Sequence, residues 1–434
     1  MNFALQRPSH MITRLRVLGG IALLAWIVIA FFWPHAAMRS YLFGYLFFID
    51  LTLGLLATLG MLYASGGAWG AFARRICEAG ALTLPLLAVL GLPLLIGAPW
   101  VFPWADKAEI AAEPVIAHRL PWIGLPWVAT RGVVFFAILI GVTYWMRRLS
   151  IAWDASSPPP LEPGARSDPE EPATSETSTT PQSLSPSPLR QGTLEPLRIA
   201  RRLDYLGRFV LCALFVIVSF WVVDFIMALE PKYTSTAFGM IMLCGQACGA
   251  MCVVILTFAM LQRRSPEPLL PPDRVHDLGK LLLTNLVMWA YTSFAQFLIQ
   301  WQGNTQNDIP FYVHRTESWW RWTGTALIFL HLGLPFVLLM SQPLKRDLRR
   351  LAWVAALILL MRFIDTLWLV APSSTHEAAG WVYPTDLLTP IAVGALWMSV
   401  FLGRLCEAPL LARAYEASGA NETGLVRTEV PHAG

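Results

Sequence analysis

Long apolar stretches alternate with short polar connections along most of this chain. Ten stretches have about the ~20 residues that an α-helix needs to cross the ~30 Å hydrocarbon core of a bilayer. They cover residues 15–33, 41–63, 78–98, 126–146, 207–229, 238–261, 278–300, 323–341, 351–371 and 385–403. A helix satisfies its own backbone hydrogen bonds in lipid, whereas an open strand does not. The pattern therefore predicts an all-α integral membrane protein with about ten transmembrane helices.

A polar segment divides these stretches into two groups. Residues 154–200 are rich in Pro, Ser, Thr and Glu and contain few large apolar side chains. Such a composition buries too little surface to offset the entropy lost on ordering. We therefore expect transmembrane helices one to four in residues 1–149, a disordered cytoplasmic linker in 150–203, helices five to ten in 204–404 and a cytoplasmic tail in 405–434.

Basic residues favour alternate connections between the stretches. Of the 32 Lys and Arg residues, 22 lie at the chain ends and in the connections on the same side, with Arg16 at the start of the first stretch counted in the amino end, whereas 6 lie in the intervening connections. By the positive-inside rule, this bias predicts both termini in the cytoplasm, for a chain in a bacterial inner membrane. The basic residues are scattered and do not form the stripe that a nucleic-acid-binding surface requires.

Seven ionisable residues within or near the predicted helices are candidates for a proton path. An ionisable side chain facing lipid is costly, so these residues should face the bundle interior, either paired or along a hydrated path. Two of them have no partner at helical spacing in their own stretch and could exchange protons through a carboxyl or imidazole group. These two are Asp50 and His331, and the other five are Asp224, Glu230, Arg362, Asp365 and Asp386.

Other polar and small residues within the stretches have simpler interpretations. Arg362 and Asp365 are three residues apart, a spacing that predicts an ion pair on one helix face. Arg131, Arg208 and Lys280 are close enough to the membrane surfaces to extend towards water. Gly245 and Gly249 have the spacing of a close helix–helix contact.

Tryptophans and cysteines each allow two interpretations. Tryptophans at both ends of the third and seventh connections fit an aromatic belt at the membrane surface or a docking surface for an external partner. Cys244, Cys248 and Cys252 share one helix face, but a zinc site would need a fourth ligand, so packing is the preferred interpretation. No metal site is predicted.

A direct quinone site is a further hypothesis. Trp221, Asp224, Trp289 and Tyr291 could supply an apolar cleft with one carboxylate, although lipid-facing aromatic residues give the same pattern. The sequence contains no Cys-x-x-Cys-His motif for covalent haem and no nucleotide-binding glycine motif. His331 is the only histidine in a predicted helix, so paired histidine ligation of an embedded haem is excluded. We therefore expect no redox centre bound by this chain.

Five segments of the chain resemble the ActF-type membrane subunit of alternative complex III. This quinol:electron-acceptor oxidoreductase subunit is itself akin to NrfD-type subunits. The segments are RSYLFGYLFFIDLTLGLLATLGMLYASGGAWGAFARRICEA, HRLPWIGLPWVATRGVVFFAILIGV, MALEPKYTSTAFGMIMLCGQACG, WAYTSFAQFLIQWQGNTQNDIPFYVHR and MSQPLKRD. The chain departs from the family pattern at QGNTQNDIP.

The resemblance implies two four-helix bundles and two extra helices, without bound haem. It also implies a related quinol-binding membrane subunit, an external iron–sulfur protein and c-type cytochromes as partners. The implied function is to support quinol oxidation and to conduct protons, as a subunit rather than a self-sufficient enzyme.

Two other functions remain open. A secondary transporter would also have about ten helices with buried charges and would place its site at helices broken in both halves. Pro85 and Pro93 interrupt the third stretch, but no matching interruption is evident in the second half. An architectural subunit whose buried charges are all paired is the other alternative.

Overall fold

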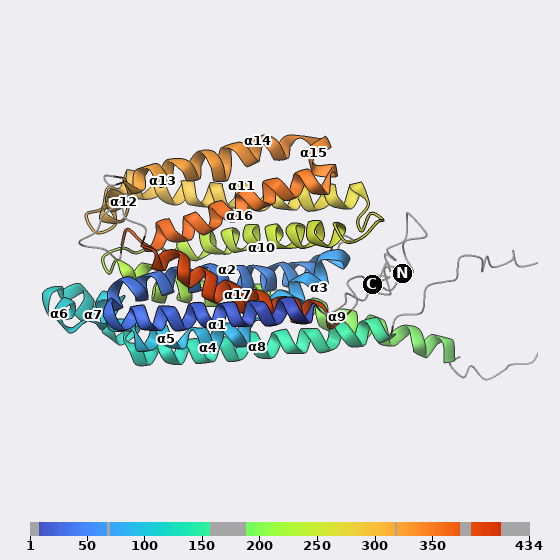
Figure 1. The fold of residues 1–434 in the computed structure, drawn as a ribbon, viewed down its shortest axis with the longest axis horizontal. Helices are drawn as coiled ribbons and strands as arrows, with labels where there is room; N and C mark the ends of the chain where they lie inside the picture. The colour runs from blue at the N-terminus through green and yellow to red at the C-terminus, as the bar shows by residue number, and fades with distance from the viewer. Residues whose placement is uncertain (1–7, 67–69, 157–187, 317–318, 374–382, 409–434) are drawn as a thin grey trace, which may run out of the picture.

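The fold is a set of long helices that lie side by side, shown in Figure 1 for a computed structural model of the chain. The structure describes residues 8–66, 70–156, 188–316, 319–373 and 383–408. Within these ranges there is no strand, and ten helical segments are long and apolar enough to cross a membrane. The predicted all-α, ten-helix fold is confirmed, and the chain is a multi-pass membrane protein.

One four-helix bundle comes from the first half of the chain. It consists of α2 (Pro34–Ser65), a segmented third span, α8 (Leu125–Ser156) and α9 (Pro188–Phe225), which pack on one another. The third span contains α3 (Gly70–Ala81), α4 (Leu84–Leu90) and α5 (Leu92–Ile96). Pro85 and Pro93 lie in the first turns of α4 and α5, where the missing N–H of proline starts a new helical segment.

A second bundle comes from the other half. It consists of α10 (Phe238–Gln262), α11 (Pro272–Gly303), a segmented eighth span and α16 (Leu348–Val370). The eighth span contains α13 (Trp320–Ala326), η4 (Leu327–Gly333) and α14 (Leu334–Met340). The two extra helices are α1 (Ser9–Phe32), which packs on α17 (Thr385–Leu405), and α17, which also packs on α2.

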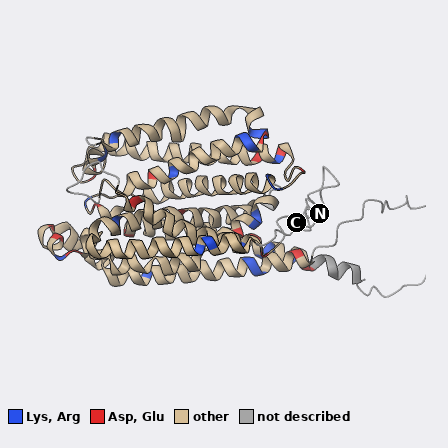
Figure 2. Cartoon of the chain, in the orientation of Figure 1, with Lys and Arg blue, Asp and Glu red and all other residues tan. Residues whose placement is uncertain are grey.

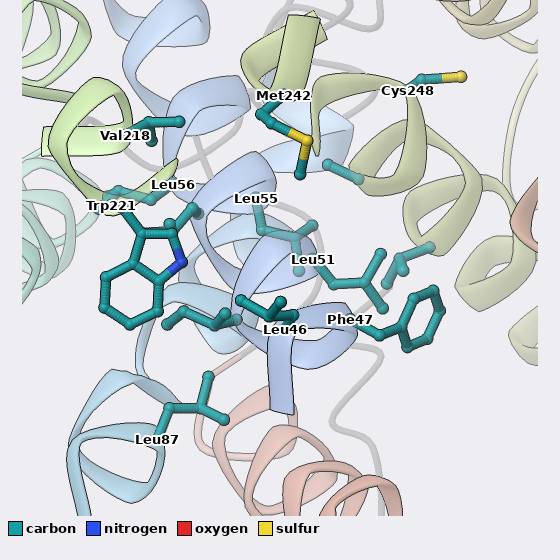
Figure 3. Packing of buried hydrophobic residues seen from close by; sticks show 14 of the residues in the cluster. Leu46, Phe47, Leu51, Leu55, Leu56, Leu87, Val218, Trp221, Met242 and Cys248 are labelled. Atoms are coloured by element: carbon teal, nitrogen blue, oxygen red, sulfur yellow. The ribbon is translucent and has the colours of Figure 1, made fainter. Parts of the chain in front are cut away.

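The contact between α2 and α10 joins the two bundles. Figure 3 shows side chains of α2 among Trp221 of α9, Leu87 of α4 and Met242 of α10. Gly54 of α2 lies against the backbone oxygen of Gln246, so that a Cβ at this position would overlap it. Glycine is required here because the two helix backbones approach closely.

Short elements cover the two ends of the bundle. At one end, on the left in Figure 1, lie α6 (Lys107–Ala112), α7 (Pro114–Ile123) and α12 (Ile309–Thr316). The connection that holds α6 and α7 also contains η1 (Ala98–Trp100) and η2 (Pro103–Ala105), and η3 (Met227–Leu229) lies between α9 and α10. At the other end lies α15 (Gln342–Arg346), and there α1 begins and α17 ends. We name these the α12 end and the α15 end.

The predicted linker is partly helical at both of its ends. Helix α8 continues to Ser156, and α9 begins at Pro188, well before the predicted start of the fifth span. Residues 188–203 include leucines, arginines and alanine, which have good helix propensity. The rest of the predicted linker, residues 157–187, and most of the predicted tail, residues 409–434, lie outside the described residues.

The eighth span contains an irregularity that was not predicted. Residues Leu327–Gly333 form a π-helical turn between two α-helical segments. Pro335 has no N–H, so the carbonyl of His331, four residues earlier, lacks its usual α-helical donor. The third span, in the first half, is divided into separate helices at Pro85 and Pro93. The eighth span, in the second half, is interrupted instead by the π-helical turn.

The tryptophans at the α12 end fall into two classes. Trp122 and Trp127 are exposed, as are Trp301, Trp319 and Trp322, which suits the surface of a membrane or of a partner. Trp104 and Trp320 are instead buried in the protein.

Candidate functional site

A polar cluster lies where α2, α10 and α16 meet. Asp50 of α2 is only 4% exposed, and its Oδ1 accepts a hydrogen bond of 2.9 Å from Nε2 of Gln246 on α10. Among the described residues, neither Oδ2 of Asp50 nor Oε1 of Gln246 has a hydrogen-bond partner. Buried polar atoms are nearly always paired, so this half-satisfied pair is a candidate for function.

Arg362 of α16 supplies the positive charge of this cluster. Its Nη1 donates a 2.5 Å hydrogen bond to Oδ2 of Asp365, which confirms the predicted ion pair. Its guanidinium lies against Gly245 of α10, where an added Cβ would lie 2.5 Å from Nη2. The close contact predicted at Gly245 is thus made with a charged side chain. Arg362 and Asp365 both act electrostatically on Asp50.

His331 is a second protonatable residue near this cation. It lies in the π-helical turn, is fully buried, and its ring centroid is 4.1 Å from that of Trp289 on α11. Neither ring nitrogen has a hydrogen-bond partner among the described residues. The guanidinium carbon of Arg362 is 5.9 Å from the Trp289 centroid, and Arg362 acts electrostatically on His331. Asp50 and His331 therefore share one buried cation as a neighbour.

Two other carboxylates of the predicted path are held in separate ion pairs. Asp224 of α9 accepts hydrogen bonds of 3.0 and 2.5 Å from Nε and Nη2 of Arg131 on α8. Arg131 therefore pairs within the bundle instead of extending to water. Asp386 of α17 accepts hydrogen bonds of 2.7 Å from Arg39 and 2.5 Å from Ser40, both on α2. By contrast, Arg208 and Lys280 are exposed, as expected.

Glu230 belongs to a third ion pair, at the α12 end. Its Oε1 accepts hydrogen bonds of 3.0 Å from Arg315 and 2.7 Å from Ser373. Arg315 is fully buried and also donates to the backbone oxygens of Phe311, Trp368 and Leu369. Burial lowers the pKa of Arg315, and the neighbouring Glu230 opposes that effect. This arginine ties α12 to the α9–α10 connection and to the end of α16.

Two tyrosines lie near the ion pair of Arg315 and Glu230. Tyr233 stacks on Phe311 with ring centroids 4.1 Å apart, and its hydroxyl accepts a 3.4 Å hydrogen bond from Gln296 of α11. Burial raises the pKa of Tyr233 above its ordinary value and that of Tyr312 to about 12. Both phenols therefore remain protonated at physiological pH and act as neutral hydrogen-bonding groups.

The seven candidates for the proton path thus separate into one cluster and three pairs. Asp50, His331, Arg362 and Asp365 come together between α2, η4 and α16. Asp224, Glu230 and Asp386 lie near the α12 end, each with a different arginine.

The four candidates for quinone binding do not form one site. Trp221 lies in the first bundle, beside an apolar recess lined by Ile49, Leu53, Phe135, Phe136, Leu139 and Ile217. Asp224 is occupied by Arg131, and Trp289 lies in the second bundle against His331. Tyr291 is 67% exposed on the surface of α11. The four residues belong to helices of two different bundles, an arrangement that one-dimensional spacing does not reveal.

A second buried ionic cluster, near the α15 end, was not predicted. Glu78 of α3 accepts hydrogen bonds from Arg75 at 2.7 Å, from Tyr63 at 3.1 Å and from Arg147. Asp154 of α8 accepts one from Arg74 at 2.6 Å and another from Arg75. By hydrophobicity alone, these arginines fall in the connections between the apolar stretches. The signal was present, because Arg74, Arg75 and Glu78 would share one side of a helix that continues into the third stretch.

The three cysteines of α10 are not arranged as ligands of a metal ion. Cys248 and Cys252 are fully buried in α10, and Cys244 is partly buried. Within the part of the chain that the structure describes, no group of three or more His, Cys, Asp or Glu residues could hold a metal ion.

No protein-family model matches this chain, and no curated protein matches it.

Proposed function

We propose that this chain is an integral membrane subunit of a quinol-oxidising respiratory complex and that it conducts protons through Asp50 and His331, with Arg362 as the fixed positive charge beside both. The similarity of five segments to ActF-type subunits supports the assignment to such a complex. One structural observation supports proton conduction: two protonatable side chains with unpaired polar atoms lie near a single buried arginine.

The chemistry of these groups suits proton transfer. A carboxyl and an imidazole group take up and release protons, whereas a guanidinium remains charged and changes the energy of both neighbours electrostatically. Moving one charge across 100 mV is worth ~2.3 kcal/mol, so even part of such a path would contribute to energy conservation. Asp365 neutralises Arg362 and keeps the cation in place.

The three ion pairs near the α12 end support an architectural role for Asp224, Glu230 and Asp386. Each carboxylate joins elements far apart in the sequence and is already occupied by an arginine. Breaking a buried pair costs ~3–5 kcal/mol because it leaves an uncompensated charge. In this proposal the three pairs position the helices, and the central cluster handles protons.

In the proposed complex, other subunits hold the redox centres. A related quinol-binding membrane subunit, an external iron–sulfur protein and c-type cytochromes would carry electrons to a cytochrome or another acceptor. This chain would contact quinone only through its apolar surface, where the recess beside Trp221 is lined by aromatic and aliphatic side chains. The bias of basic residues supports a bacterial inner membrane with both termini in the cytoplasm.

Purification from native membranes tests membership of the complex. We expect an affinity-tagged chain in mild detergent to retain stoichiometric c-type cytochromes and an iron–sulfur protein, with quinol:acceptor activity. A strain with the same tag on an unrelated membrane protein is the control. If the chain purifies alone and mediates uptake of a solute, it is a transporter and the proposal is wrong.

A further inference from the structure

A cluster of basic residues at the α15 end, seen as blue segments in Figure 2, is not explained by the function proposed above. Arg274, Lys280, Lys345 and Arg346 lie where α15 packs on the first turns of α11. The stem of Lys345 contacts Gly279, the residue before Lys280, and Arg346 lies 3.1 Å from Asp273 at the start of the same helix, so the cations of α15 lie along the first turns of α11. We name these four cations the α11–α15 basic cluster.

Acidic residues compensate only part of this charge. Asp277 is shared by Arg274 at 3.6 Å and Lys280 at 3.4 Å, and Asp273 lies 3.1 Å from Arg346. No ion pair or hydrogen bond of the Lys345 ammonium is found among the described residues. Four cations thus face two carboxylates, which leaves room for about two negative charges from a ligand.

Lys345 is held in position by a glycine. It is 92% buried because its hydrocarbon stem lies over Gly279 of α11, where an added Cβ would be 2.8 Å from its Cγ. A lysine whose ammonium is simply hydrated does not need a glycine beneath its stem, because the stem can extend into water. The fit fixes where the ammonium emerges, at the first turns of α11.

The surroundings of the cluster favour an amphipathic ligand. Met340, at the end of α14, is 61% exposed, and Trp353, in the second turn of α16, is 69% exposed. These apolar side chains lie within about two turns of α15, on the helices that precede and follow it. A ligand that contacts both regions needs an anionic head and an apolar tail, as phospholipids have. Clusters of basic residues at the ends of transmembrane helices attract anionic lipids.

We propose that the α11–α15 basic cluster binds the phosphodiester headgroup of an anionic phospholipid, with Lys345 positioned by Gly279 as its central contact. The acyl chains pack along α14 and α16. A lipid with two phosphates would match the uncompensated charge most closely. The site does not depend on the redox function of the chain.

Lipid titration by native mass spectrometry tests this site. The purified protein is titrated with dioleoyl phosphatidylglycerol or dioleoyl phosphatidylcholine, and we expect it to prefer the anionic lipid. Each basic residue near an anionic headgroup contributes about a fivefold preference, equivalent to ~1 kcal/mol. Lys345→Gln should therefore lower the preference about fivefold, and Lys345→Arg should retain most of it.

Gly279→Ala is the decisive variant because it changes no charge. Its methyl group displaces the Lys345 stem, so we expect a loss similar to that of Lys345→Gln, with an unchanged thermal midpoint to confirm folding. Gly403→Ala is the matched control, because a Cβ there meets no atom within 4 Å. An unchanged lipid preference in both Gly279→Ala and Lys345→Gln would overturn the proposal. Equal competition by glycerol 3-phosphate would also overturn it and indicate a soluble anion.

Discussion

Arg362→Met is expected to destabilise the protein more than any other single substitution in the central cluster. Asp365 would remain buried without its cation, and Asp50 would lose a neighbouring positive charge. Removing one partner of a buried pair costs ~3–5 kcal/mol, a large part of the ~5–15 kcal/mol that stabilises a typical fold. We expect the yield of monodisperse protein in detergent and the thermal midpoint measured by fluorescence-detected size-exclusion chromatography to fall together.

Two further variants separate charge burial from a general effect of the substitution. Arg208→Met removes an exposed arginine that pairs with Asp204, and it should change the thermal midpoint little. The double variant Arg362→Met with Asp365→Leu should recover much of the lost stability, because apolar pairs often replace a buried ion pair without cost. If Arg362→Met is as stable as Arg208→Met, the cluster is not buried as described.

Arg315→Met is expected to release α12 from the bundle. The substitution removes the cation of Glu230 and leaves the backbone oxygens of Phe311 and Leu369 without this donor. Because Glu230 retains some access to water, we expect a cost near the lower end of the range for broken buried pairs, ~3 kcal/mol. That cost corresponds to about 100-fold faster exchange of protected amides in α12, measured by hydrogen–deuterium exchange.

Arg321→Met provides the comparison for this prediction. Arg321 lies near the same end of the bundle, is exposed, and contacts the ring of Trp322. Its loss should leave exchange in α12 unchanged. Equal exchange in α12 for Arg315→Met and wild type would show that other contacts hold this segment.

The sequence predicted what depends on a single helix. The ten spans follow from hydrophobic length, and the pair of Arg362 with Asp365 follows from a three-residue spacing. The buried position of Asp50 and His331 follows from the cost of exposing them to lipid. Each inference used only residues close together in the chain.

The sequence could not predict contacts between helices. Asp224 pairs with a residue 93 positions away, and Asp386 pairs with one 347 positions away, so both pairs depend on which helices are neighbours. For the same reason, the sequence did not predict that Gln246 is the partner of Asp50. It also did not predict that the quinone candidates belong to two different bundles. The π-helical turn at His331 required knowledge of how Pro335 is accommodated in the packed span.

The number of protons translocated per electron by a complex that carries Asp50→Asn tests the central claim most directly. The whole complex would be reconstituted in liposomes, and the protons translocated per electron would be measured during quinol oxidation.

Asn has nearly the same shape as Asp and retains a hydrogen-bond acceptor for Gln246, but it does not exchange protons at this position. Asp204→Asn, which changes a partly exposed carboxylate paired with Arg208, is the control. We predict that Asp50→Asn lowers the ratio by at least about half while assembly and electron transfer persist, since a mid-membrane carrier is lost. An unchanged ratio in the assembled complex would contradict a proton-carrying role for this cluster.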